Sequence, residues 1–165
     1  MTSILKKVAI VAIAATMSVS ANAQSKGDMA VGGNLVIGTG DSYTNVGIGA
    51  KFQYNVIDPL RLEGSFTFFP KKDLVSFWDL SVNGHYLFPV ASQITVYPLA
   101  GLGIFGSRAN LGVLGTYSDS DVCFNIGGGV DFKLTDQLFL NGELKYKIVN
   151  HWNRFMIAAG VTYKF

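Results

Sequence analysis

The sequence predicts an all-β fold, an eight-stranded antiparallel up-and-down transmembrane β-barrel, and residues 122–148 carry the two main observations. In this stretch, VCFNIGGGVDFKLTDQLFLNGELKYKI, even positions outside the central TDQ are apolar, aromatic or glycine, and charged and amide side chains take odd positions. A period of two places alternate side chains on opposite faces of a β-strand. The apolar face carries no charge over about 9–11 residues per strand, the length that a tilted strand needs to cross a bilayer.

Residues 1–23 have the pattern of a cleaved secretory signal peptide. Lys6 and Lys7 precede an apolar segment, and Ala21-Asn22-Ala23 forms a small-residue cleavage site. A retained membrane anchor is the alternative, but the apolar run is short for a spanning helix of about 20 residues. We therefore expect a mature chain that begins at Gln24 and forms one barrel domain over residues 24–165.

The composition of the mature chain excludes two classes of protein. Without Lys6 and Lys7 the 13 basic residues fall to 11, equal to the 11 acidic residues, so nothing indicates nucleic-acid binding. The single cysteine, Cys123, excludes an intrachain disulfide framework. By its alternation Cys123 points inward, where we expect it to act as a small space filler.

Four segments in the first half of the domain show the alternation. Residues 29–37 place apolar side chains at odd positions, and residues 46–56 give the most regular pattern, with one at every even position. Residues 60–68 alternate leucine and phenylalanine with arginine, glutamate, serine and threonine. Residues 78–88 alternate apolar and aromatic residues with aspartate, serine, asparagine and histidine, so each segment predicts a strand.

Four further strands are predicted in the second half. Residues 94–105 form the least regular one, because Pro98 cannot donate to a ladder; a closed barrel has no free edge, so we expect a bulge there. Residues 122–134 and 138–148 form a hairpin around Thr135-Asp136-Gln137, and residues 154–165 complete the barrel. The other predicted turns are 58–59 and 89–93, and the predicted loops are 39–45, 70–73, 106–120 and 150–153.

An even number of strands places both chain ends on one side of the membrane, with short turns on the periplasmic side and the longest loop, 106–120, outside. Outward-facing aromatic residues gather near both ends of the strands, as expected for interfacial girdles. The predicted periplasmic girdle contains Tyr54, Tyr86, Phe88, Phe132, Tyr163 and Phe165, and the outer girdle contains Phe66, Phe68, Trp78, Phe124, Tyr146 and Phe155.

The inward face predicts a filled lumen. Eight strands enclose a space just wide enough for side chains, and inward charges of both signs indicate a paired network, because unpaired buried charge is costly. Glu143 is the predicted centre, opposite Gly127 and Gly160, with Lys145, Lys51 or Arg61 in reach. Asp79 and Ser81 are expected near Gly101 and Gly103. The candidate lumen network is Lys51, Arg61, Glu63, Asp79, Asp131, Lys133, Glu143 and Lys145, and Asp121, Lys147, Arg154 and Lys164 also face inward.

Two patterns resemble catalytic or cofactor motifs. Gly101, Gly103 and Gly106 match GxGxxG, but a dinucleotide site needs a helix there, and residues 107–120 have no helical pattern. Asp79, Ser81 and His85 share one face, but Ser81 and His85 are about 13 Å apart along a strand, whereas a nucleophile and its base need about 3 Å.

The remaining candidates lie in predicted outer loops. His151 has no obvious serine partner, and Asp119 and Asp121 supply too few oxygens for calcium. We expect no catalytic residue, no cofactor and no metal site. Basic side chains at the outer rim could bind lipopolysaccharide phosphates, and a solvated rim is the alternative. These side chains are Lys71, Lys72 and Arg108.

The segment NIGGGVDFKLTDQLFLNGELKYKI and the terminal VTYKF resemble the small outer-membrane β-barrel proteins related to OmpX and the OmpA membrane domain. The resemblance implies an integral protein of the bacterial outer membrane with both termini in the periplasm. It also implies that Val161, Tyr163 and Phe165 form the signal that the barrel-assembly machinery reads. The peptidoglycan-binding role of longer OmpA-type proteins is not carried over.

We therefore predict a monomeric barrel with a structural or surface-interaction role and a lumen plugged by charge. Its expected partners are outer-membrane lipid, lipopolysaccharide as a candidate, and the assembly machinery. The alternatives are a small pore or transporter, a lipid-modifying barrel enzyme and a soluble lipocalin-type barrel. The uncharged face on all eight strands argues against the last, which would bury that face.

Overall fold

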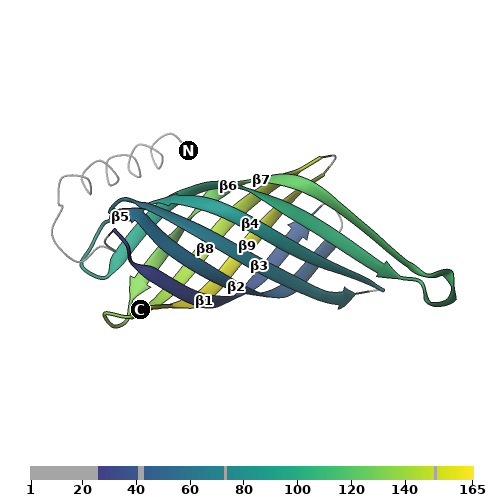
Figure 1. Ribbon diagram of the computed structural model, residues 1–165, viewed down its shortest axis with the longest axis horizontal. Coiled ribbons are helices and arrows are strands. Elements are labelled where there is room, and N and C mark those ends of the chain that lie inside the picture. The colour runs from purple at the N-terminus through teal and green to yellow at the C-terminus, as the bar shows by residue number, and fades with distance from the viewer. Residues whose placement is uncertain (1–25, 41–42, 73, 151) are drawn as a thin grey trace.

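The computed structural model describes residues 26–40, 43–72, 74–150 and 152–165, and in this part of the chain eight long antiparallel strands close into a barrel (Figure 1). Each strand pairs with its sequence neighbours, and β1 closes the barrel against β9. The long strands are β1 (Met29–Gly40), β2 (Tyr43–Ile57), β3 (Leu60–Lys72), β4 (Val75–Tyr86), β6 (Ile94–Asn110), β7 (Thr116–Lys133), β8 (Leu138–Val149) and β9 (Trp152–Lys164). The predicted fold class is confirmed.

Two of the sequence predictions fall on residues that the structure leaves undescribed. The proposed signal peptide, residues 1–23, remains a prediction, and so does the position of His151. Among the described residues, no helix is long and apolar enough to span a bilayer.

The two faces of the sheet have the predicted polarity. On β4, Leu80 is 48% exposed on the outer face, whereas its neighbour Asp79 is 5% exposed inside the barrel. Closure brings the polar face inward, so charged groups such as Arg61 and Glu63 are buried and large apolar side chains cover the outer surface. This arrangement suits a lipid environment, in which every backbone hydrogen bond must be made within the sheet.

The predicted bulge at Pro98 is wrong. Pro98 pairs with Gly128 on β7 without a register shift. On the other side, His85 pairs with Leu99 and Phe88 pairs with Val96, so the spacing is equal on both strands. The proline lacks an N–H to donate, and the ladder is interrupted opposite it, which separates the two-residue strand β5 (Phe88–Pro89) from β4.

At the end of the barrel opposite the C-terminus the hairpins are longer than predicted, because strand pairing continues through segments rich in turn-forming residues. Gly40 pairs with Tyr43, β3 continues through Pro70 to Lys72 with a register irregularity, and β9 begins at Trp152. The predicted loop 106–120 is mostly ladder, since β6 and β7 pair as far as Asn110 and Thr116. The turn between them contains one 3-10 helix, η1 (Gly112–Leu114), and this hairpin extends well beyond the others (Figure 1).

The connections at the opposite end are short, as predicted. Asp58 and Pro59 form a turn, and the Thr135 hydroxyl accepts hydrogen bonds from the N–H groups of Gln137 and Leu138. The Phe165 N–H donates to the Met29 carbonyl, so the end of the chain lies beside the start of β1 at this same end. We call this end of the barrel the turn end and the opposite end the hairpin end.

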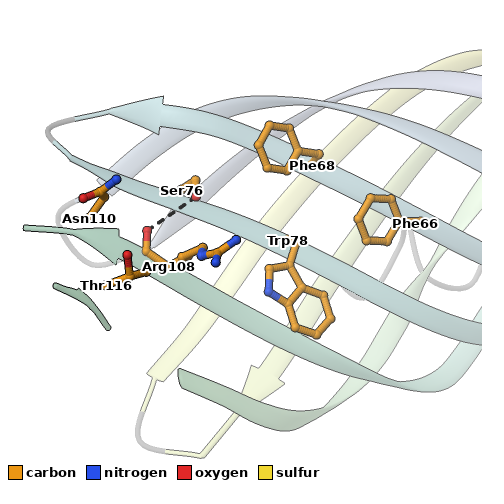
Figure 2. Close-up of a pocket in the computed structure, with 7 residues that line it drawn as sticks. All are labelled: Phe66, Phe68, Ser76, Trp78, Arg108, Asn110 and Thr116. Atoms are coloured by element: carbon orange, nitrogen blue, oxygen red, sulfur yellow. Dashed lines mark hydrogen bonds between the residues drawn. The ribbon is translucent and has the colours of Figure 1, made fainter. Parts of the chain in front are cut away.

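The outward aromatic residues occupy both predicted levels. Tyr54, Tyr86 and Tyr163 are exposed near the turn end. Phe66 and Phe68 are exposed near the hairpin end, where they line one pocket with Trp78 (Figure 2).

Candidate functional site in the barrel lumen

The observed register differs from the predicted neighbours of Glu143. Glu143 lies opposite Gly129 on β7 and Ala158 on β9, while Gly127 and Gly160 lie opposite Lys145 and Asn141. On the β9 side the reason is loop length, because Val149 pairs with Trp152 and the connection is two residues shorter than predicted. A shift of two residues keeps every side chain on its face, so alternation cannot detect it.

The register on β4 and β6 was predicted in part. Ser81 does lie opposite Gly103, but Asp79 lies opposite Phe105, and Gly101 lies opposite Asn83. Gly101, Gly103 and Gly106 are all within β6, and none opens a helix, as the sequence analysis expected. Added side-chain atoms at Gly101 and Gly103 would overlap groups on β4, so these glycines provide space.

Glu143 is held by a tyrosine and a lysine in the buried lumen. The Tyr97 hydroxyl donates to Glu143 Oε2 at 2.7 Å, and Lys145 Nζ lies 3.5 Å from Glu143 Oε1. Lys145 is therefore the predicted partner that the structure places at Glu143. Lys51 lies instead 3.9 Å from Glu63 Oε2, and Gln53 donates to that oxygen at 2.7 Å.

Arg61 is fully buried and links three groups. Its Nη1 donates to Asp131 Oδ2 at 2.6 Å, its Nε donates to His85 Nδ1 at 3.1 Å, and its guanidinium lies 4.7 Å from the centre of the Tyr97 ring. His85 stacks on Tyr97 with ring centres 4.5 Å apart. The set formed by these contacts is called the central charge cluster: Lys51, Arg61, Glu63, His85, Tyr97, Asp131, Glu143 and Lys145.

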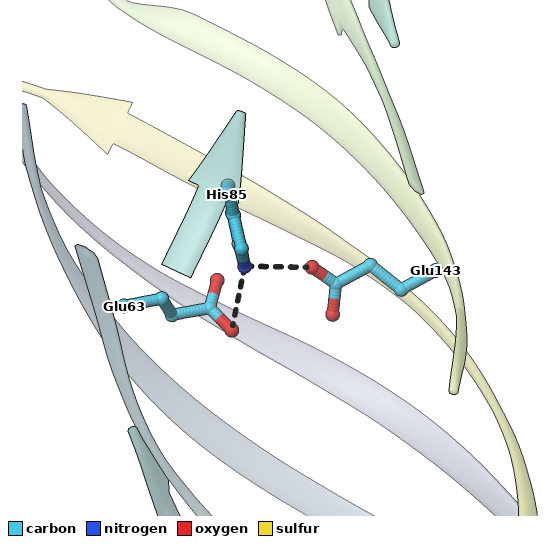
Figure 3. Close-up of side chains that lie close together, drawn as sticks. All are labelled: Glu63, His85 and Glu143. Carbon is cyan, nitrogen blue, oxygen red and sulfur yellow. Dashed lines mark ion pairs between the residues drawn. The ribbon is translucent and has the colours of Figure 1, made fainter. Parts of the chain in front are cut away.

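His85 and two carboxylates face one another inside this cluster (Figure 3). His85 Nε2 lies 3.9 Å from both Glu63 Oε1 and Glu143 Oε2, and the candidate ligand atoms lie within 4.8 Å of one another. His85 Nδ1 accepts from Arg61, so the proton of a neutral ring is on Nε2, which then has no lone pair for a metal. The cluster's carboxylates are also matched by its own cations, and both facts favour a charge network over a cation site.

A second polar group lies toward the hairpin end and contains Asp79. Lys147 Nζ is 2.9 Å from Asp79 Oδ2 and donates to Asn125 Oδ1 at 2.6 Å. Ser81 donates to Asp79 Oδ1 at 2.7 Å, whereas His85 is bonded to Arg61 in the central charge cluster. The three residues that suggested a triad therefore belong to two separate groups. Cys123 is buried beside Lys147, consistent with a filler.

One predicted member of the network lies elsewhere. Lys133 pairs with Asp136 at 3.2 Å in the exposed β7–β8 turn, because its strand ends there. The other seven predicted residues are buried in the lumen. At the predicted outer rim, Arg108 is exposed, while the side chains of Lys71 and Lys72 are outside the described part of the chain.

An aromatic layer lies inside the barrel at the hairpin end. The Arg154 guanidinium lies 5.2 Å from the Phe69 ring centre and 5.1 Å from that of Phe105, and it donates to Asn45. Val36 and Met156 pack in the same buried cluster. This layer was not predicted from the sequence. His85, considered only as a triad candidate, and Tyr97 were left out of the predicted lumen network, although their inward positions in the alternation could have identified them.

Comparison with known proteins agrees with this architecture. The model of the outer membrane protein beta-barrel domain family matches residues 9–165. The crystal structure of Ail from Yersinia pestis is similar at 20% identity and a TM-score of 0.62, over 85% of this chain and 99% of Ail. The N-terminal barrel of Pseudomonas aeruginosa OprF is similar at 19% identity and a TM-score of 0.68, over 86% of this chain and 100% of that domain.

Neisserial surface protein A is similar at 18% identity and a TM-score of 0.66, over 84% of this chain and 96% of that protein. A search of curated proteins finds no significant match. These structural likenesses establish the fold, and the family match covers nearly the whole chain. The chain therefore belongs to the outer membrane protein β-barrel domain family, and its barrel is integral to the bacterial outer membrane.

Proposed function

We propose that this protein is a non-conducting barrel that presents the β6–β7 hairpin at the cell surface as an interaction element. The protruding hairpin carries the proposal, because its tip is apolar and uncovered. Val113 and Leu114 are fully or almost fully exposed, and Leu111 and Tyr117 are also exposed. Covering an exposed apolar group with a partner removes it from water and lowers the free energy, so such a tip is suited to binding an apolar surface.

The side chains buried inside the barrel support the non-conducting part of the proposal. The central charge cluster and the Lys147–Asp79 group occupy the polar interior, and the aromatic layer around Arg154 occupies the hairpin end. Side chains thus fill the narrow space inside eight strands, and no continuous water path is expected. The alternative, a small pore, predicts measurable conductance.

The difference between the two ends of the barrel supports an orientation in the outer membrane. Outer-membrane barrels have short periplasmic turns and longer outer loops, and the chain terminus lies at the end with short turns. The proposal therefore places the turn end in the periplasm and the β6–β7 hairpin outside.

The proposal includes no enzyme activity. The Ser81 hydroxyl donates a hydrogen bond to Asp79, and His85 accepts one from Arg61, so Ser81 and His85 form no nucleophile–base pair. Activity on a lipid that is lost in His85→Ala without loss of folding would contradict this part of the proposal.

Replacing the apolar tip should remove binding to apolar surfaces. Each large apolar side chain covered by a partner contributes about 1.5–3 kcal/mol, so Val113→Asp with Leu114→Asp should weaken retention by more than about tenfold. The measurement is retention of bacteria displaying the protein on phenyl-coated beads. The control, Ser118→Asp with Ser120→Asp, adds the same charge to the same hairpin without removing apolar surface. Equal loss in both pairs, or none in the tip pair, would contradict the proposal.

The terminal aromatic residue is proposed as the assembly signal together with Val161 and Tyr163. Phe165 also donates its N–H to Met29 at 3.0 Å, beside the β1–β9 closure. Deletion of Phe165, or Phe165→Asp, should slow insertion and leave aggregate in the periplasm, while Phe165→Tyr should insert normally. Fractionation after pulse labelling measures the inserted share. Normal insertion of the deletion would remove the signal role and leave the fold unaffected.

A further inference from the structure

A pocket of about 580 Å³ lies on the outside of the barrel wall near the hairpin end (Figure 2). It shares no lining residue with the central charge cluster or with the exposed apolar residues of the hairpin tip. Aromatic side chains line the part of the pocket nearer the middle of the barrel, and polar groups line the part nearer the hairpin tip. The lining residues are Phe66, Phe68, Ser76, Trp78, Arg108, Asn110 and Thr116.

The aromatic floor depends on a glycine. Trp78 on β4 pairs with Phe68 on β3 and with Gly106 on β6. A Cβ atom at residue 106 would overlap the Trp78 indole, so only glycine allows the ring to lie against the wall there. Phe66 and Phe68 continue this floor and are each more than 40% exposed on the outer face. The floor lies at the level of the outer aromatic girdle and therefore borders the hydrocarbon region.

A cation lies directly beyond the floor. Arg108 follows Gly106 by two residues on the same face of β6, about 7 Å farther along the strand. The Ser76 hydroxyl donates to the Arg108 carbonyl at 3.4 Å, which ties this part of β6 to β4. No ion pair is found for the Arg108 guanidinium among the described residues, in contrast to the paired cations of the lumen. An exposed guanidinium at headgroup depth suits a phosphate, which it can bind through two parallel hydrogen bonds.

We propose that this pocket binds lipopolysaccharide, with a phosphate of its lipid A headgroup on Arg108 and an acyl chain on Phe66, Phe68 and Trp78. The order of groups along the wall matches that amphiphile, because the apolar floor lies toward the membrane centre and the cation and amide lie toward the outside. Asn110 and Thr116 supply further polar groups at the headgroup level. The inference rests on the proposed orientation but not on the hairpin tip or the closed lumen.

Native mass spectrometry of the detergent-refolded full chain tests the site with three probes: diphosphoryl lipid A, dephosphorylated lipid A and phosphatidylglycerol. The wild type should retain one diphosphoryl lipid A in preference to both others. Arg108→Gln should lower that retention by about tenfold, since it removes a charge-assisted contact. Arg108→Lys should restore part of it. Lys164→Gln, at the turn end, is the matched control and should retain lipid A as the wild type does.

A second variant examines the floor. Gly106→Ala should displace the indole and weaken retention of lipid A, with heat-modifiable gel mobility confirming that the barrel is folded. Retention of dephosphorylated lipid A or phosphatidylglycerol equal to that of diphosphoryl lipid A would overturn the proposal, and so would an unchanged Arg108→Gln. A protein dimer in place of the lipid-bound species would assign the pocket to a second copy and also overturn it. None of these outcomes bears on the hairpin-tip assay, so the two proposals fail separately.

Discussion

Glu143→Ala should lower the free energy of unfolding of the barrel by about 3–5 kcal/mol, the cost of breaking a buried ion pair by removing one partner. The substitution leaves Lys145 without the carboxylate at 3.5 Å and removes the acceptor of the Tyr97 hydroxyl. Both groups are buried, so water cannot readily replace the lost partner. Urea titration of the barrel in lipid vesicles measures the change.

The control for this variant is the same kind of pair at the surface. Asp136→Ala removes a carboxylate 3.2 Å from Lys133, but the Asp136 side chain is 96% exposed. An exposed pair contributes at most about 1 kcal/mol, so this variant should unfold nearly as the wild type does. Similar losses in both variants would show that Glu143 is not in a desolvated network.

The same variant distinguishes the closed barrel from the pore. In planar bilayers the wild type should conduct weakly or not at all, because the central charge cluster is proposed to close the lumen, and Glu143→Ala should raise the conductance. A large, steady wild-type conductance that Glu143→Ala leaves unchanged would make the pore hypothesis the better one. The stability measurement would remain valid in that case, since it depends only on burial.

The number of strands and the burial of most predicted lumen charges were predictable, because both follow from a period of two. Arg61, Glu63, Asp131 and Glu143 face inward in any register that preserves the alternation, so their burial could be inferred without knowing their partners. The partners depend on loop length, and the β8–β9 connection was predicted two residues too long. The contact of Arg61 with His85 depends on register in the same way. The contact of Arg61 with Asp131 crosses the lumen between β3 and β7, which are not neighbouring strands, so neither contact could be read from the sequence.

The features missed outside the lumen have a different physical cause. Residues such as Gly112 and Gly115 favour turns, so the sequence predicted a long loop; cross-strand hydrogen bonds instead carry the β6–β7 ladder to within a few residues of them. The contact of Trp78 with Gly106 joins the consecutive long strands β4 and β6, and it depends on the register between them. A local pattern contains no information on such a contact, and the outer pocket was therefore unforeseen, although Arg108 at its edge had been singled out.

Leu102→Arg should lower the stability of the barrel by about 2–4 kcal/mol, the cost of arginine near the bilayer midplane. Leu102 is 54% exposed and pairs with Val82 on β4, midway between the aromatic levels marked by Trp78 and Tyr86. The charged side chain would lie in hydrocarbon, and it could reach water only by bending toward a headgroup region. Unfolding in vesicles, at the same lipid composition as for Glu143→Ala, measures the loss.

The matched control is Leu114→Arg, the same chemical change in the adjoining hairpin turn, where the side chain is 84% exposed. That position lies beyond the hairpin-end aromatic girdle, so the variant should change stability by less than about 0.5 kcal/mol. Both variants lose a leucine and gain an arginine, so the difference between their losses of stability reports the depth of the position in lipid. If Leu102→Arg proved as harmless as Leu114→Arg, the exposed face of β6 would not be the lipid face, and the assignment of inside and outside would have to be reversed.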